Sequence, residues 1–237
     1  MLYLINYAQR GPARFVSHLE VSRALERALR RAGLPLKLSQ GFNPRPYLSF
    51  ALPLPVGMSG RSELAVVELS QALPATEVQA RLAAEMPPGF ALKLVHPLAP
   101  GTVPSAVVVA ALYRARPGWE PYPSRPELER AVVELLNRPF FTLEAKGQNK
   151  DVRPGILDLR VRGGAKSSYL ILFLAAGSQR YLRPELALSA LAQVGGWKEE
   201  RPPVLERLGL FGCRGRHPVP LGALLTAPAP ARRDRWR

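Results

Sequence analysis

Residues 17–33 read SHLEVSRALERALRRAG and lie between two strand-like runs, LYLINY at residues 2–7 and LPLKLS at residues 34–39. Ser17, followed three residues later by Glu20, is the capping-box pattern that begins a helix. Apolar residues recur every three or four positions after it, with arginines on the opposite side, and a glycine ends the stretch. The stretch therefore predicts an amphipathic helix that joins two strands.

The next hundred residues continue this alternation of strands and helices. Strand-like runs lie at residues 47–55 and 63–70, a helix is expected from about residue 74 to before Pro87, and ALKLVHPL at residues 91–98 is a further strand. The resulting order is strand, helix, strand, strand or hairpin, helix, strand. This is the βαββαβ pattern of a ferredoxin-like domain.

The second half of the chain repeats landmarks of the first half at nearly constant spacing. Ser124 follows Ser17 by 107 residues, while Arg153-Pro154 and Glu185 follow Arg45-Pro46 and Glu77 by 108. Strand-like runs and two further helices occur between these landmarks in the same order as before. The shared spacing indicates duplication of one structural unit.

These patterns predict an α+β protein made of two tandem ferredoxin-like (βαββαβ) domains with a disordered basic C-terminal tail. The first domain is expected at residues 1–98 and the second at residues 106–211, with a linker at residues 99–105. Residues 212–237 are rich in arginine, proline and alanine and show little periodicity, which is typical of a disordered segment.

The charge of the chain is strongly positive, with 33 Lys and Arg against 18 Asp and Glu, a net charge of +15. An arginine-rich genome exchanges lysine for arginine, but it does not by itself create such a surplus. The surplus therefore favours a polyanionic partner, and RNA is the predicted one. No apolar run is long enough to span a membrane, and no basic segment precedes the apolar N-terminal run, so we expect no membrane association, no signal peptide and a cytoplasmic location.

The single cysteine, Cys213, excludes an intramolecular disulfide and a cysteine-held metal cluster within this sequence. The three histidines are far apart, and no nucleotide-binding or hydrolase motif is present. We therefore expect no metal and no cofactor. Whether the protein is an enzyme stays open, and the sequence favours a non-enzymatic role.

A first candidate anion site follows from the stiff, polar segment QGFNPRP at residues 40–46. Strands one and two of a βαββαβ unit run parallel, so the loops after both strands are expected at one rim of the sheet, beside the positive N-terminal end of the first helix. The side chains predicted to gather there are Arg10, Arg14, His18, Gln40, Asn43 and Arg45.

A second candidate rim occupies the equivalent place in the second domain, around GQNKDVRPG at residues 147–155. Its basic groups are Lys146, Lys150 and Arg153. Asp151 offers an alternative, because its pairing with Arg153 would make that arginine structural. Two such rims on tandem domains could hold one extended anionic ligand.

Residues 15–57, FVSHLEVSRALERALRRAGLPLKLSQGFNPRPYLSFALPLPVG, resemble the opening of the bacterial radical SAM-linked, or radical SAM-associated, protein family, a domain of unknown function. DVRPGILDLRV at residues 151–161 and YLRPEL at residues 181–186 are similar to its second-half signature, so the resemblance covers about residues 1–211. The resemblance implies a partner, because such domains are fused to, or encoded beside, cobalamin-binding radical SAM proteins. This sequence lacks a three-cysteine cluster motif, so a radical SAM protein would act in trans.

Three functions are compatible with these features. The first is a non-enzymatic RNA-binding accessory protein that works with a separate cobalamin-type radical SAM protein in RNA modification or processing. The second is a metal-independent endoribonuclease of tandem ferredoxin-like type, with His18 as general acid or base. The third is a scaffold that binds a phosphorylated small molecule or an acidic protein. Cleavage of RNA without metal would distinguish the second from the first.

Overall fold

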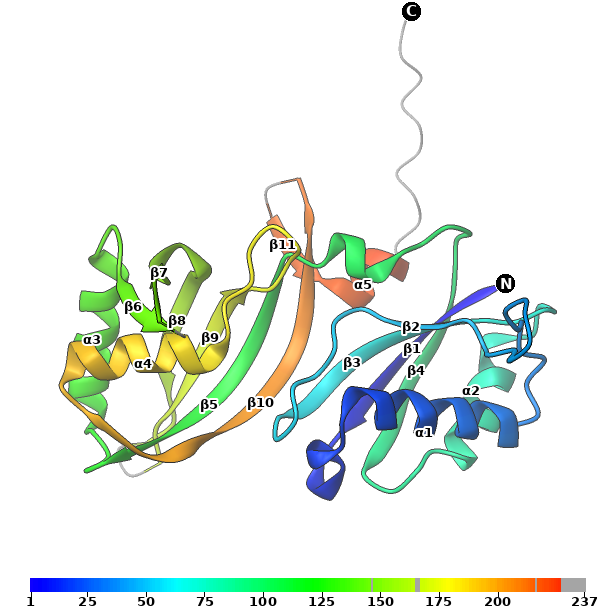
Figure 1. The fold of residues 1–237 in the computed structure, drawn as a ribbon, viewed down its shortest axis with the longest axis horizontal. Helices are drawn as coiled ribbons and strands as arrows, with labels where there is room; N and C mark the ends of the chain where they lie inside the picture. Colours follow the sequence, from blue (N-terminus) through cyan, green and yellow to red (C-terminus); the bar gives the residue numbers. More distant parts are fainter. Residues whose placement is uncertain (146, 165–166, 216, 227–237) are drawn as a thin grey trace, which may run out of the picture.

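The structure is a computed structural model that describes residues 1–145, 147–164, 167–215 and 217–226 (Figure 1). It confirms a mixed α+β fold, with helices packed on one large, mostly antiparallel sheet. The first half contains β1 (Leu2–Gln9), η1 (Gly11–Phe15), α1 (His18–Arg31), β2 (Leu48–Phe50), β3 (Ser59–Glu68), α2 (Ala75–Ala84) and β4 (Phe90–Leu98). After the short helix η2 (Pro104–Val107), the second half contains β5 (Ala110–Glu120), α3 (Arg125–Asn137), β6 (Thr142–Ala145), β7 (Gln148–Asp151), η3 (Arg153–Gly155), β8 (Ile156–Arg162), β9 (Tyr169–Ala175), α4 (Pro184–Gly195), β10 (Lys198–Arg214), β11 (His217–Pro220) and α5 (Leu221–Thr226).

Both predicted capping boxes are present. In α1 the Ser17 N–H donates to Glu20 Oε2 at 2.7 Å, and the Glu20 N–H donates to Ser17 Oγ at 3.3 Å. In α3 the Ser124 hydroxyl donates to Glu127 Oε2 at 2.5 Å, and the Ser124 backbone N–H donates to the same oxygen at 2.8 Å. These hydrogen bonds lower the pKa of both glutamates, because they favour the charged carboxylate. The two serines therefore begin equivalent helices, as the repeat spacing predicted.

The two halves have the same strand order. In the first half the order is β4-β1-β3-β2, and in the second half it is β10-β5-β9-β8, with antiparallel pairing between all neighbours. The halves meet at a seam, where residues 59–60 of β3, outside the stretch that pairs with β2, pair in parallel with residues 206–207 of β10. The sheet thus runs without interruption from β4 to β8.

The helices cover one side of the sheet in each half. Helices α1 and α2 bury residues such as Leu25 and Leu82 against Ile5 and Val67 of the strands. Helices α3 and α4 bury Leu128 and Leu191 against the buried residues of β5, β8 and β9. On the other side, α5 packs on β10, β11, β4 and η2, so it covers the region around the seam, while its main contacts do not extend to β5, β8 and β9 of the second half. Among the described helices, none is long and apolar enough to cross a membrane.

A buried ion pair crosses the seam on the helix-covered side. Arg207 is fully buried and Glu63 is 2% exposed, and the Arg207 Nε donates to Glu63 Oε1 at 3.0 Å while Nη2 donates to Glu63 Oε2. The same guanidinium donates to the carbonyls of Leu52 at 2.7 Å and Pro53 at 3.3 Å. Burial disfavours the charged guanidinium, but the Glu63 carboxylate outweighs it and the pKa of Arg207 is raised. The pair therefore stays charged.

The prediction of a strand at residues 34–39 is wrong. These residues form only isolated bridges, Leu36 with Leu69 and Leu38 with Pro46, and the second strand of the first half is β2, which follows the QGFNPRP loop. The alternating LPLKLS pattern resembles a strand, but Pro35 lacks an N–H and the adjacent residues make turn-like contacts, such as the Leu36 N–H to the Leu34 carbonyl. This shift moves the loop to the other end of the sheet.

The tail predicted from residue 212 is also wrong in its first part. β10 continues to Arg214, β11 pairs with it, and α5 follows, with Leu221 fully buried in the core. Leucines at positions 221, 224 and 225 give this segment an apolar face that the composition of the whole tail conceals. Residues 227–237 lie outside the described part of the chain.

We expect Glu63→Gln to reduce the free energy of unfolding by about 3–5 kcal/mol, because it leaves the Arg207 charge buried without a counterion. Denaturant unfolding with unchanged m-value measures this loss. The matched control is Glu134→Gln, which removes an exposed ion pair with Arg138 on α3 and should cost about 0.5 kcal/mol. Equal losses in the two variants would contradict the role of the seam pair.

Candidate functional site

Four arginines lie on the open side of the sheet in the second half. They are Arg114 and Arg116 on β5, and Arg160 and Arg162 on β8, and we call this set the arginine face. Each alternates along its strand with a buried residue, so the pleat directs the arginines away from helices α3 and α4. Arg114 and Arg160 share Ile171 of β9 as their directly opposite partner, which places all three on the same side.

Aromatic side chains lie among these arginines. The Arg114 guanidinium sits over the Tyr169 ring at 4.5 Å from its centroid, and Tyr169 is directly opposite Arg162. Farther along the same side, the Phe173 and Phe211 rings meet edge to face at 5.2 Å. Guanidinium planes and aromatic rings on an open sheet suit the phosphates and bases of a nucleic acid.

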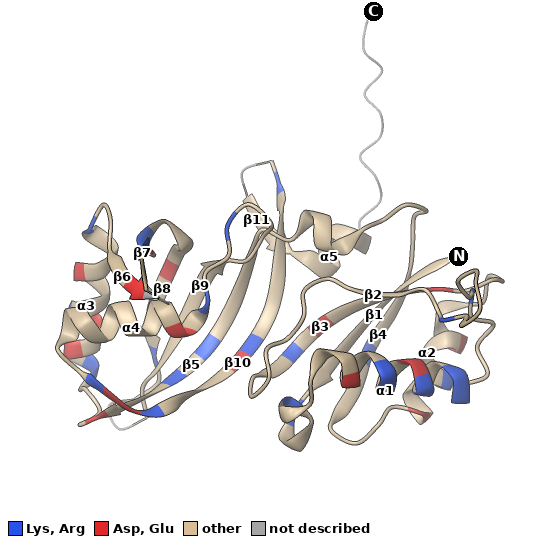
Figure 2. Cartoon of the chain, viewed as in Figure 1, with Lys and Arg blue, Asp and Glu red and all other residues tan. Residues whose placement is uncertain are grey.

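Basic residues of the first half lie across the seam from the arginine face, and Figure 2 shows Lys and Arg positions on strands of both halves. Glu206 Oε1 forms ion pairs with Arg61 Nε at 3.4 Å and with Arg10 Nη2 at 3.8 Å. Partial burial lowers the pKa of Lys93, and the nearby charges of Arg10 and Arg61 lower it further despite the attraction of Glu206. The neighbouring arginines disfavour the protonated form of this lysine, which indicates that positive charge is in excess here. A bound anion would reduce this repulsion.

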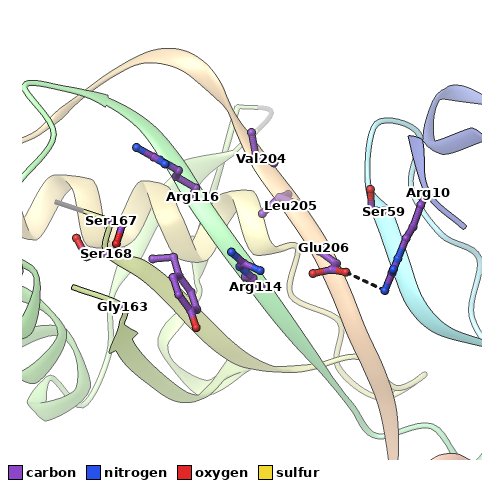
Figure 3. Close-up of a pocket in the computed structure, with 11 residues that line it drawn as sticks. Arg10, Ser59, Arg114, Arg116, Gly163, Ser167, Ser168, Val204, Leu205 and Glu206 are labelled. Atoms are coloured by element: carbon purple, nitrogen blue, oxygen red, sulfur yellow. Dashed lines mark ion pairs between the residues drawn. The ribbon is translucent and has the colours of Figure 1, made fainter. Parts of the chain in front are cut away.

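A pocket of about 530 Å³ lies over the seam between the two groups of basic residues (Figure 3). We call it the seam pocket, and its lining residues are Arg10, Ser59, Arg114, Arg116, Gly163, Ser167, Ser168, Tyr169, Val204, Leu205 and Glu206. Its volume falls within the usual range for small-ligand sites. Elsewhere in the described residues, no group of three or more His, Cys, Asp and Glu side chains is placed to hold a metal ion.

A family model described as "Uncharacterized protein conserved in bacteria (DUF2344)" matches residues 3–184. The chain belongs to this bacterial family. The match to DUF2344 includes all four residues of the arginine face. No curated protein matches the chain. A crystal structure of an unknown protein from Galdieria sulphuraria is similar at 14% identity, covering 87% of this chain and 98% of that one, with a TM-score of 0.27.

The structure does not bring the first predicted rim together. Arg10 and Arg14 follow the end of β1 where Gln9 pairs with Gly60. Gln40, Asn43 and Arg45 are exposed in a loop held at the opposite end of the sheet, where the Lys37 N–H donates to the Glu68 carbonyl at 2.9 Å. The predicted convergence is wrong because the loop precedes the second strand instead of following it.

His18 occupies the first turn of α1 and packs edge to face on Phe50, with ring centroids 4.7 Å apart. Phe50 is the last residue of β2, whereas Arg45 precedes that strand. A proposed acid–base role for His18 therefore lacks the predicted neighbour Arg45. Arg14 is half-buried and sits over the Phe15 ring at 4.6 Å, which orients its guanidinium locally.

In the second half, Arg153 is a structural residue. Its guanidinium donates to the carbonyls of Ile156 at 2.8 Å and Leu136 at 2.7 Å. The backbone N–H of Arg153 donates to Asp151 Oδ1 at 3.1 Å. Lys150 is exposed on β7, and Lys146 lies outside the described residues. Of the two described basic residues of the second rim, Lys150 is therefore exposed for an anion, whereas the Arg153 guanidinium is used in hydrogen bonds within the protein.

The arginine face was missed by the sequence interpretation, although a signal for it exists. The segments RAR at residues 114–116 and RVR at residues 160–162 each place two arginines two positions apart within a strand-like run. A spacing of two puts both side chains on the same face of a strand. Only the strand order shows that the two segments share a surface, because β9 lies between them.

We expect Arg61→Gln to raise the pKa of Lys93, because it removes a repelling charge and frees Glu206 to attract the ammonium. An NMR titration of the lysine side chains measures the pKa. Arg138→Gln, far away on α3, should leave it unchanged. An unaltered pKa in Arg61→Gln would show that the cations at the seam are not electrostatically coupled.

Proposed function

We propose that this protein is a non-enzymatic RNA-binding accessory protein, and that RNA binds across the arginine face. The observation that carries the proposal is the set of four exposed arginines on two strands of one sheet, beside Tyr169. Phosphate contacts supply most of the affinity of nucleic-acid binding, and aromatic or guanidinium planes add stacking on bases. The net charge of +15 supports a polyanionic ligand over a neutral one.

We also propose that the two halves are tandem ferredoxin-like units. Their common strand order, their two capping boxes and the Arg-Pro pairs that precede β2 and β8 support this interpretation. Ferredoxin-like RNA-binding domains of the RRM type use the open side of their four-stranded sheet, where aromatic residues stack on bases. The arginine face is on the corresponding side of the second half, which is support by analogy of fold.

The proposed partner is a separate cobalamin-type radical SAM protein in the cytoplasm. This part rests on the resemblance of residues 15–57, 151–161 and 181–186 to radical SAM-associated proteins. The sequence has one cysteine, so the three-cysteine cluster would belong to the partner. The test is purification of the tagged chain from its source cells without oxygen, followed by protein identification and iron analysis. Absence of any iron–sulfur protein from the complex would refute the partner.

We expect Arg114→Gln with Arg116→Gln to weaken binding of single-stranded RNA roughly tenfold or more at physiological salt. The plot of log affinity against log salt concentration has a negative slope, and its magnitude should decrease by roughly 1.4, because two phosphate contacts are lost. Fluorescence anisotropy at several salt concentrations measures both quantities. Unchanged thermal unfolding would confirm that the variant is folded.

The charge-matched control is Arg81→Gln with Arg138→Gln, two arginines that pair with Glu77 and Glu134 on helices away from the open side. It should bind RNA nearly as the parent does. A second comparison, Arg45→Gln with Lys150→Gln, removes groups of the rims that the sequence predicted. If either pair of changes weakens binding as much as the β5 pair, the arginine face is not the RNA site.

We expect the parent protein to leave labelled RNA intact when incubated without metal, because the predicted general acid–base group His18 packs on Phe50 and lies away from the arginine face. Gel analysis of the RNA over several hours measures this. Cleavage that disappears in His18→Ala while binding persists would establish the endoribonuclease alternative instead.

A further inference from the structure

The seam pocket combines two kinds of wall. Its cationic groups stand on two sides, with Arg114 and Arg116 of β5 on one side and Arg10, from the end of β1, across the seam. Its apolar part lies between them on β10 and is formed by Val204, which is 62% exposed. At about 530 Å³ the pocket is much larger than a phosphate group requires. A ligand that matches it has both a charged part and a flat apolar part.

We infer that the seam pocket binds one nucleotide, with its phosphate on the arginines and its base against Val204 and Tyr169. The inference rests on the proposed RNA-binding function, because it names the unit of RNA that this part of the surface recognises. A free nucleotide has the same chemistry as one unit of a single-stranded RNA, and the experiment below separates these two sources. Duplex RNA does not fit, because its bases are not available for such a pocket.

The electrostatics of the pocket favour one phosphate. Glu206 is the carboxylate in its lining, and it is shared between Arg10 and Arg61. One carboxylate cannot neutralise these two arginines together with Arg114 and Arg116. The positive charge that remains is the complement of a phosphate, and guanidinium groups bind phosphates with paired hydrogen bonds.

Arg114 is preorganised for this contact. Its guanidinium lies over the Tyr169 ring, which fixes the plane of the group while its N–H donors stay at the edges. Tyr169 follows Ser168, whose carbonyl accepts a hydrogen bond from the Tyr122 hydroxyl at 3.0 Å. The strand end that carries the stacking ring is therefore held before any ligand arrives, so little freedom is lost on binding.

The pocket also offers hydroxyl groups. Ser59 and Ser167 line it, and their side chains suit a ribose or the polar edge of a base. The hydroxyl of Ser168, which is 2% exposed, is buried away from this surface, so Ser168 contributes through its main chain, whose carbonyl holds the Tyr122 hydroxyl.

The experiment compares three probes on the full chain: uridine monophosphate, inorganic phosphate, and a labelled single-stranded RNA of roughly eight nucleotides. The variants are Arg116→Gln and Val204→Ser in the pocket. The matched control is Arg160→Gln, which lies on the arginine face, pairs with Asp158 and does not line the pocket. Calorimetry gives the affinity for each small probe, anisotropy gives that for RNA, and thermal unfolding checks each fold.

We expect uridine monophosphate to displace the RNA and to bind more tightly than inorganic phosphate. Arg116→Gln should weaken the mononucleotide about tenfold, the size of one lost charge-assisted contact. Val204→Ser should weaken it as well, because it removes apolar surface against which the base is proposed to lie. Arg160→Gln should weaken RNA binding while leaving the mononucleotide affinity unchanged.

The outcomes separate the two proposals. If RNA binds through Arg114 and Arg160 but the mononucleotide never competes, the pocket inference is overturned and the RNA-binding function stands. If inorganic phosphate binds as tightly as the mononucleotide, the base makes no contact and the inference is overturned too. If the mononucleotide binds and RNA does not, the pocket is a site for free nucleotide and the proposed function fails.

Discussion

The buried ion pair between Glu63 and Arg207 is the interaction on which the shape of the sheet depends. Parallel pairing between β3 and β10 extends over only two residue pairs, 59 with 206 and 60 with 207, so backbone hydrogen bonds alone fix the seam weakly. The Arg207 guanidinium adds bonds to Glu63 and to the carbonyls of residues 52 and 53, all of them in the first half. A charge that is buried in one half and satisfied by the other couples the two halves energetically.

The same two positions of β10 also build the open side. Successive residues of a strand point to opposite faces, so Arg207 enters the core while Glu206 points to the other side and meets Arg10 and Arg61. If the register of β10 against β3 slipped by one residue, both contacts would be lost together. The position of the seam pocket between the two sets of basic residues is therefore a consequence of the buried pair. Structure and the candidate site share one constraint.

Local signals in the sequence predicted local features well. Ser17 with Glu20 and Ser124 with Glu127 begin helices because their hydrogen bonds span three residues and need no tertiary contact. The LPLKLS pattern failed because alternation favours a strand only where a partner strand is available. The error then displaced the whole first rim, since it reversed which end of the strand the Arg45 loop occupies. Neither the Glu63–Arg207 pair, 144 residues apart, nor the arginine face has a local signal sufficient to identify it, because both depend on strand order.

If the basic surface binds anions as proposed, Glu206 would make it discriminate among them. In the structure it pairs with Arg10 and Arg61, so a ligand phosphate that recruits these arginines must displace a carboxylate that is already in place. Within the described residues, Arg114 and Arg116 form no ion pair with a carboxylate, so a phosphate would displace none there. The Arg114 guanidinium is also oriented by stacking on the Tyr169 ring. A single phosphate would then bind first on the β5 arginines, and a longer chain would gain the Arg10 side only by exchanging ion pairs. Such an exchange costs part of the Coulombic gain and makes contact geometry, not net charge alone, decide which polyanions bind tightly.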